Sequence, residues 1–94
     1  MYFNDGDIYD GEWRNDKAEG KGIYYGNKEP FKGDIYEGDH RNGLREGKGI
    51  YYYNNGVRYE GDWKNNNREG NGIMYYKNGK IEEGIWKNDQ LVTN

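Results

Sequence analysis

Aromatic residues and glycines recur along this chain in two short blocks. The first block has the form Tyr-Glu-Gly-Asp-Trp and begins at positions 9, 36, 59 and 82, so its copies are 27, 23 and 23 residues apart. The second block has the form Gly-Lys-Gly-Ile-Tyr and begins at positions 20, 47 and 70, eleven residues after each of the first three starts. A recurrence of this length indicates a repeat architecture, in which each unit packs mainly on its neighbours.

We interpret residues 1–94 as one repeat domain, divided into a half unit (1–8), three units (9–35, 36–58 and 59–81) and a second half unit (82–94). The first complete unit holds four extra residues within 26–32, which we expect to lengthen a hairpin tip. Half units at both ends predict strand edges without a partner in the domain, so edge-to-edge self-association is one expectation.

Each block predicts a short β-strand. Glycine at alternate positions, as in Gly47 and Gly49, would cost a helix about 1 kcal/mol per residue relative to alanine. Asp-Gly or Asn-Gly pairs at 5–6, 55–56 and 78–79 lie between runs rich in Tyr, Ile and Trp, which is typical of β-hairpins. The predicted fold is all-β: an elongated, single-layer antiparallel sheet of seven or eight strands, stacked hairpin by hairpin and curved so that one face forms a groove.

The register follows from the side-chain period of two. A two-residue loop at Asn55-Gly56 would place Tyr52 opposite Tyr59, whereas a three-residue loop at 54–56 places Tyr51 there and sets Gly49 opposite Gly61. We favour the second register because it gathers rings and glycines on one face, where rings can cover bare backbone. The other face then receives acidic and basic residues together with Ile23, Tyr25, Ile50, Tyr52, Ile73, Tyr75 and Ile81.

Composition restricts the possible functions. Apolar residues make up only 32% of the chain and charged residues 33%, so 11 Tyr and three Trp must supply most of the core. The net charge of −3, without any basic run, argues against nucleic acid as a partner and disfavours an anionic membrane. The absence of cysteine and of any signal or membrane-spanning pattern leads us to expect a cytoplasmic protein.

Catalysis and metal binding find little support in the residue types. The chain has no Cys, no Ser and a single histidine, His40, which we interpret as a packing substitution for Trp. We therefore predict no enzyme activity, no cofactor and no metal. Acidic residues recur with the repeat: Glu12, Asp39, Glu60, Asp62 and Glu83. Their recurrence favours a solvated stripe over a catalytic or calcium site, and the basic residues expected to pair with it are Arg14, Arg58, Lys64 and Lys87.

The ring-bearing face is the remaining candidate for function. Two interpretations stay open: its rings pack only on one another, or they leave an exposed apolar patch that binds a partner. A partner-binding groove would comprise Tyr9, Trp13, Tyr24, Tyr36, His40, Tyr51, Tyr53, Tyr59, Trp63, Tyr76 and Trp86. Its expected occupant is an amphipathic helix or an extended peptide of a protein partner.

These blocks resemble the MORN repeat (membrane occupation and recognition nexus), whose unit is similar to Tyr-Glu-Gly-Glu-Trp, a polar connector, Gly-Lys-Gly and aromatics before an Asn-Gly turn. The match covers nearly the whole chain, with its spacing in register. The departures are His40 in place of a Trp, Glu82 in place of a Tyr, and the longer first spacing of 27 residues. The resemblance implies stacked hairpins that serve mainly as scaffolds, as in junctophilins and ciliary radial-spoke proteins, and hence a cytoskeletal or ciliary setting. The family name also supplies the alternative function, a peripheral phospholipid-binding module.

Overall fold

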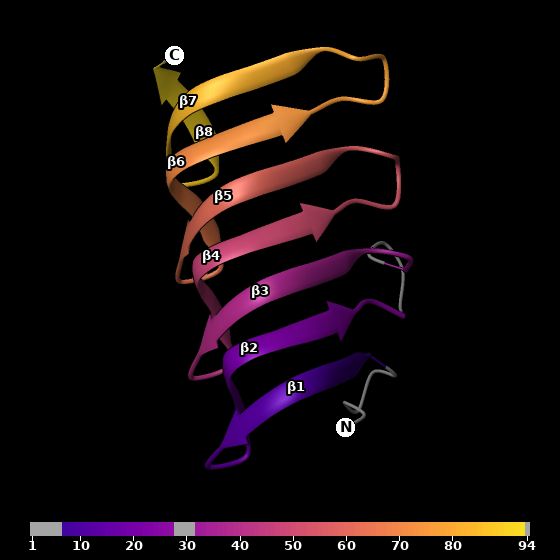
Figure 1. Cartoon of the computed structure of the whole chain (residues 1–94), viewed down its shortest axis with the longest axis vertical. Coiled ribbons are helices and arrows are strands. Elements are labelled where there is room, and N and C mark those ends of the chain that lie inside the picture. The colour runs from indigo at the N-terminus through magenta and orange to yellow at the C-terminus, as the bar shows by residue number, and fades with distance from the viewer. Residues whose placement is uncertain (1–6, 28–31, 94) are drawn as a thin grey trace.

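The described part of the chain forms one antiparallel sheet (Figure 1). The computed structural model describes residues 7–27 and 32–93. In these residues the strands follow one another across the sheet in chain order: β1 (Ile8–Arg14), β2 (Lys17–Tyr25), β3 (Ile35–Arg41), β4 (Leu44–Tyr52), β5 (Arg58–Lys64), β6 (Asn67–Tyr75), β7 (Ile81–Lys87) and β8 (Gln90–Thr93). The predicted all-β, single-layer fold is confirmed, and with extents of 38 × 23 × 17 Å it is elongated.

The three-residue hairpin loop is also confirmed. Tyr53 N donates to Val57 O at 2.8 Å, Gly56 N donates to Tyr53 O at 3.1 Å, and Gly56 has a φ of +92°, which L-residues rarely adopt. Tyr51 consequently pairs with Tyr59, and Gly49 with Gly61. The Asp-Gly turn expected at 5–6 and most of the insertion within 26–32 lie outside the described residues.

A β-bulge interrupts the register in each complete unit. The shifts lie between Gly11 and Trp13 in β1, between Gly38 and His40 in β3, and between Gly61 and Trp63 in β5. A bulge bends its strand and increases the local twist. Its repetition curves the whole sheet, as the ribbon shows (Figure 1).

Paired glycines create the space for the core rings. Each Tyr that opens a unit lies across a glycine of the following strand: Tyr59, for example, covers Gly72, where an added Cβ would lie only 2.5 Å from Tyr59 Cε1. The Tyr9, Tyr36 and Tyr59 hydroxyls donate to the backbone carbonyls of Glu12, Asp39 and Asp62 at 3.0, 2.9 and 3.1 Å. Bare backbone therefore forms one wall of every ring site.

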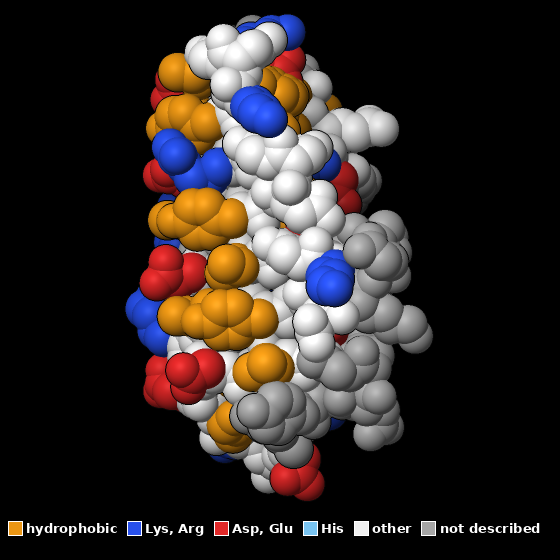
Figure 2. Space-filling view, turned by 90° about the vertical axis from the view of Figure 1, so that its right-hand side faces the viewer, with side chains coloured by type: hydrophobic (Ala, Val, Ile, Leu, Met, Phe, Trp, Pro, Cys, Tyr) orange, Lys and Arg blue, Asp and Glu red, His pale blue; other side chains and the backbone are white. Residues whose placement is uncertain are grey.

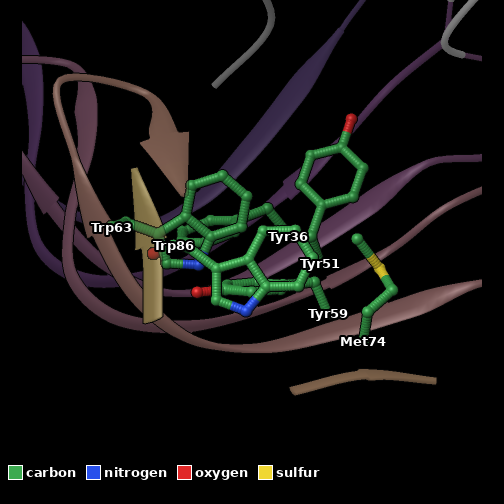
Figure 3. Packing of buried hydrophobic residues seen from close by; sticks show 6 residues of the cluster. All are labelled: Tyr36, Tyr51, Tyr59, Trp63, Met74 and Trp86. Atoms are coloured by element: carbon green, nitrogen blue, oxygen red, sulfur yellow. The ribbon is translucent and has the colours of Figure 1, made fainter. Parts of the chain in front are cut away.

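Rings from successive units interlock along the sheet (Figure 3). Trp63 packs edge-on against Tyr36 and Tyr59, with centroid distances of 5.4 and 5.2 Å, and Trp86 packs in the same way on Tyr59 at 5.4 Å. The Trp63 and Trp86 indole N–H groups donate to the Gly49 and Gly72 carbonyls. Trp63 and Trp86 thus each join their own unit to the preceding one.

Candidate functional site on the ring face

We call the concave surface that bears Tyr9, Tyr36 and Tyr59 the ring face. These three side chains are 0%, 1% and 0% exposed, so they pack on their neighbours and do not themselves offer a surface to a partner. Of the eleven residues predicted for a binding groove, four are half-buried, Trp13, Tyr24, Tyr53 and Tyr76, while the other seven are buried: Tyr9, Tyr36, His40, Tyr51, Tyr59, Trp63 and Trp86. Curvature explains the difference, because it brings rings of adjacent units into contact and closes most of the groove.

Three of the recurring carboxylates bind backbone at the bulges: those of Glu12, Asp39 and Asp62. Glu12 Oε2 accepts a hydrogen bond from Lys21 N at 2.8 Å, and Asp62 Oδ2 accepts one from Asn71 N at 3.0 Å. The residue before each of these donors is a glycine with positive φ, and a Cβ there would lie within 3.0 Å of the carboxylate. The acids therefore stabilise the fold, a role that sequence reasoning missed although their constant nine-residue spacing to the donor was visible.

Asp39 shows the electrostatics of this arrangement. Its Oδ2 accepts from Lys48 N at 3.2 Å, and its Oδ1 pairs with the Lys21 ammonium. Burial alone would raise the pKa of Asp39, but the hydrogen bonds from Lys21 and from Lys48 N outweigh it, so this pKa is lowered. The other ion pairs of the described residues are Lys48–Asp62, Arg58–Glu60 and Arg68–Asp89, so of the predicted basic partners only Arg58 forms one.

Buried aspartates bind tyrosine hydroxyls near the hairpin tips. Asp34, only 5% exposed, accepts from the Tyr51 hydroxyl and from Asn54 N, both at 2.7 Å. Asp7 binds Tyr24 and Asn27 in the same way. Burial, together with the Asp34 carboxylate, raises the pKa of Tyr51 above its usual range, so its hydroxyl stays protonated and donates.

Arginine side chains cover two of the tryptophans. Arg45 Cζ lies 4.7 Å from the centroid of Trp63, and Arg68 Cζ lies 5.2 Å from that of Trp86. The guanidinium Nη2 atoms donate to the carbonyls of Asn66 and Asp89 at 2.9 and 2.7 Å. Sequence analysis did not select these arginines, because only the curvature of the sheet carries them over the rings of the next unit.

His40 occupies the position that Trp63 holds one unit later. It packs edge-on against Tyr9 and Tyr36 at 4.9 and 5.0 Å, so its interpretation as a packing substitution agrees with the geometry. Burial lowers the pKa of His40, and the nearby Arg45 charge lowers it further, while hydrogen bonding with the backbone of Gly38 and Gly20 acts in the opposite direction. The imidazole is therefore neutral at pH 7.

A cleft of about 430 Å³ opens on the ring face beside His40. Rings from the first two complete units form much of its lining, including Tyr9, Trp13, Tyr24 and Tyr36. We call this hollow the ring-face cleft. Cavities of a few hundred Å³ lined by rings and a few polar groups are typical of binding sites.

The opposite, outer face carries a row of partly exposed apolar residues. One cross-strand row consists of Ile8, Tyr25, Ile35, Tyr52, Arg58, Tyr75 and Ile81. Tyr25, Tyr52 and Ile81 are 37%, 38% and 56% exposed. Figure 2 shows a column of hydrophobic side chains along the molecule with acidic and basic side chains beside it, so this row is a second surface available to a partner.

The described residues hold no cluster of three or more His, Cys, Asp or Glu side chains that could bind a metal ion. A search of the same residues found no helix that could span a membrane.

Comparison with protein families gives one result. The family model described as MORN repeat matches three consecutive segments, residues 9–28, 36–58 and 59–81. A comparison with curated proteins finds no significant match.

Proposed function

Since this chain belongs to the MORN repeat family, whose modules are implicated in protein or membrane interaction, we propose that it is a non-catalytic scaffold that binds a segment of another protein in the ring-face cleft. The observation that supports this proposal is the cleft itself, a hollow of about 430 Å³ on a face where most of the rings are buried. Half-buried Trp13 and Tyr24 on its lining offer a partner apolar surface beside polar groups. Such rings are enriched among residues that dominate binding energy.

The proposed partner segment is a helix or an extended peptide, which inserts side chains while its backbone follows the groove. Acidic and basic side chains are interspersed on the outer face, and the net charge is −3, which gives anionic lipid no electrostatic attraction. A protein partner is therefore the better candidate for this module than a bilayer.

The test uses two variants that modify opposite faces. Trp13→Ala removes a ring from the cleft, whereas Tyr52→Ser removes a 38% exposed ring from the outer face. Proteins captured by the parent from its native source are mapped to a binding segment by cross-linking, and that segment is synthesised and titrated by calorimetry. We expect Trp13→Ala to weaken its binding at least tenfold and Tyr52→Ser to leave it unchanged.

The converse pattern, with binding lost only in Tyr52→Ser, would assign the partner to the outer face and overturn the proposal. Flotation with vesicles of phosphatidylcholine and phosphatidylserine at physiological salt is the third measurement. Co-flotation of the parent, abolished by Tyr52→Ser, would instead establish a membrane-binding module.

A further inference from the structure

Three coupled positions differ between the repeat interfaces. At the interface between units 36–58 and 59–81 these positions hold Arg45, Trp63 and Asn66, and the guanidinium lies over the indole with its Nη2 on the Asn66 carbonyl. At the next interface they hold Arg68, Trp86 and Asp89, with the same contacts.

The first interface has a smaller residue at each of these positions. By the register of the strands and turns, Ala18 stands in place of Arg, His40 in place of Trp, and Gly43 in place of Asn or Asp. All three residues line the ring-face cleft. The cleft is therefore the space that an arginine side chain fills at the other two interfaces.

We propose that the ring-face cleft accepts an arginine side chain from the partner, which takes the place that Arg45 and Arg68 occupy in the following units. This inference rests on the proposed function and specifies the chemistry of the partner segment. The internal arginines define the expected contacts, because Arg45 lies over Tyr36 and Trp63, whose counterparts one unit earlier are Tyr9 and His40. The guanidinium is therefore expected against the Tyr9 and His40 rings, with its N–H groups donating to a backbone carbonyl of the 42–43 turn.

The charges around the cleft permit a cation. Two acidic residues, Asp7 and Asp16, and two basic residues, Lys17 and Arg45, line it, so their formal charges cancel. The chain as a whole carries a net charge of −3. Arg45 belongs to the next unit, two strands or about 10 Å along the sheet, and Arg45 and Arg68 stand at the same separation from each other.

His40 contributes its ring. The side chain is only 6% exposed, and its Nδ1, which has no hydrogen-bond partner among the described residues, has no accessible surface, so the imidazole offers a guanidinium a ring contact and not a hydrogen bond. Nε of Arg45 also lacks a partner and would favour a carboxylate, so an acidic ligand is the competing outcome of the test.

The experiment titrates the ¹⁵N-labelled full chain with Nα-acetyl-arginine amide and follows chemical shifts by NMR. Citrulline and glutamate derivatives with the same blocked termini serve as the neutral and acidic probes. We expect saturable shifts at Ala18 and Gly43 and at the His40 ring, with at least tenfold weaker binding of the citrulline probe and none of the glutamate probe.

Ala18→Arg is the decisive variant, because it fills the cleft with an arginine side chain of the protein itself, the residue already present at positions 45 and 68. It is expected to remain folded and to lose binding of the arginine probe at least tenfold, while Tyr52→Ser on the outer face binds it like the parent. Absence of saturable shifts, equal binding of the glutamate probe, or unchanged binding by Ala18→Arg would overturn the inference. A partner segment that still binds the cleft without needing an arginine would leave the proposed function intact while refuting this inference.

Discussion

Replacement of Gly72 by Ala tests the principle on which every unit is built. The new Cβ would lie 2.5 Å from Tyr59 Cε1 and closer still to its hydroxyl group, whereas carbon atoms in contact are normally about 3.5–4.0 Å apart. Gly72 does not have a positive φ, so the effect is one of space and not of backbone conformation. The Tyr59 ring must move by roughly 1 Å or more.

The cost follows from what this movement breaks. Overpacking a core costs about 1–3 kcal/mol, a ring pair contributes about 0.5–1.5 kcal/mol, and a hydrogen bond about 1 kcal/mol. The moving ring contacts both Trp63 and Trp86, and its hydroxyl donates to Asp62 O. We expect a loss of roughly 4 kcal/mol, a large share of the roughly 5–14 kcal/mol usual for a domain of this length.

The assay is urea unfolding followed by tryptophan fluorescence, with a double-mutant cycle. Tyr59→Ala alone should also cost about 4 kcal/mol, but the double variant Tyr59→Ala/Gly72→Ala should cost little more, because the collision disappears with the ring. Gly79→Ala is the matched control: it has a φ of +92° and no atom within 4 Å, so it should lose only the roughly 1–2 kcal/mol of left-handed strain. Additive costs in the cycle, or a loss below about 1 kcal/mol for Gly72→Ala, would refute the reasoning.

Two further predictions concern charged groups. Asp62→Ala removes the acceptor of Asn71 N and the partner of Lys48, so we expect the free energy of unfolding in urea to fall by about 1–3 kcal/mol. The control Glu60→Ala breaks the exposed pair with Arg58 and should lower it by under about 1 kcal/mol. Equal losses in the two variants would contradict the role of Asp62 at the bulge. Because the pKa of His40 in the folded chain lies below its ordinary 6.5, the unfolded chain binds more protons between these two values, and stability should fall as the pH drops from 6.5 through the folded pKa. His40→Trp should lack this dependence in thermal unfolding between pH 5 and 8, since His40 is the only histidine; an unchanged profile would disprove the assignment.

The sequence by itself determined the strands, their order and their register. The 23-residue recurrence, the Asn-Gly turns and the alternation of side chains are local properties, so the pairing of Tyr51 with Tyr59 and of Gly49 with Gly61 followed without knowledge of the packing. The use of glycine as a surface for rings followed from the same register.

Only the tertiary structure decided which residues are exposed and where the candidate site lies. Tyr59 is buried because the bulges curve the sheet until rings of adjacent units meet, and the sum of many small bends is not visible in any one repeat. The ring-face cleft depends on Ala18, His40 and Gly43, which come from two different hairpins. Each substitution alone is a minor departure from the repeat, and they form a cavity only because the fold brings the three positions together.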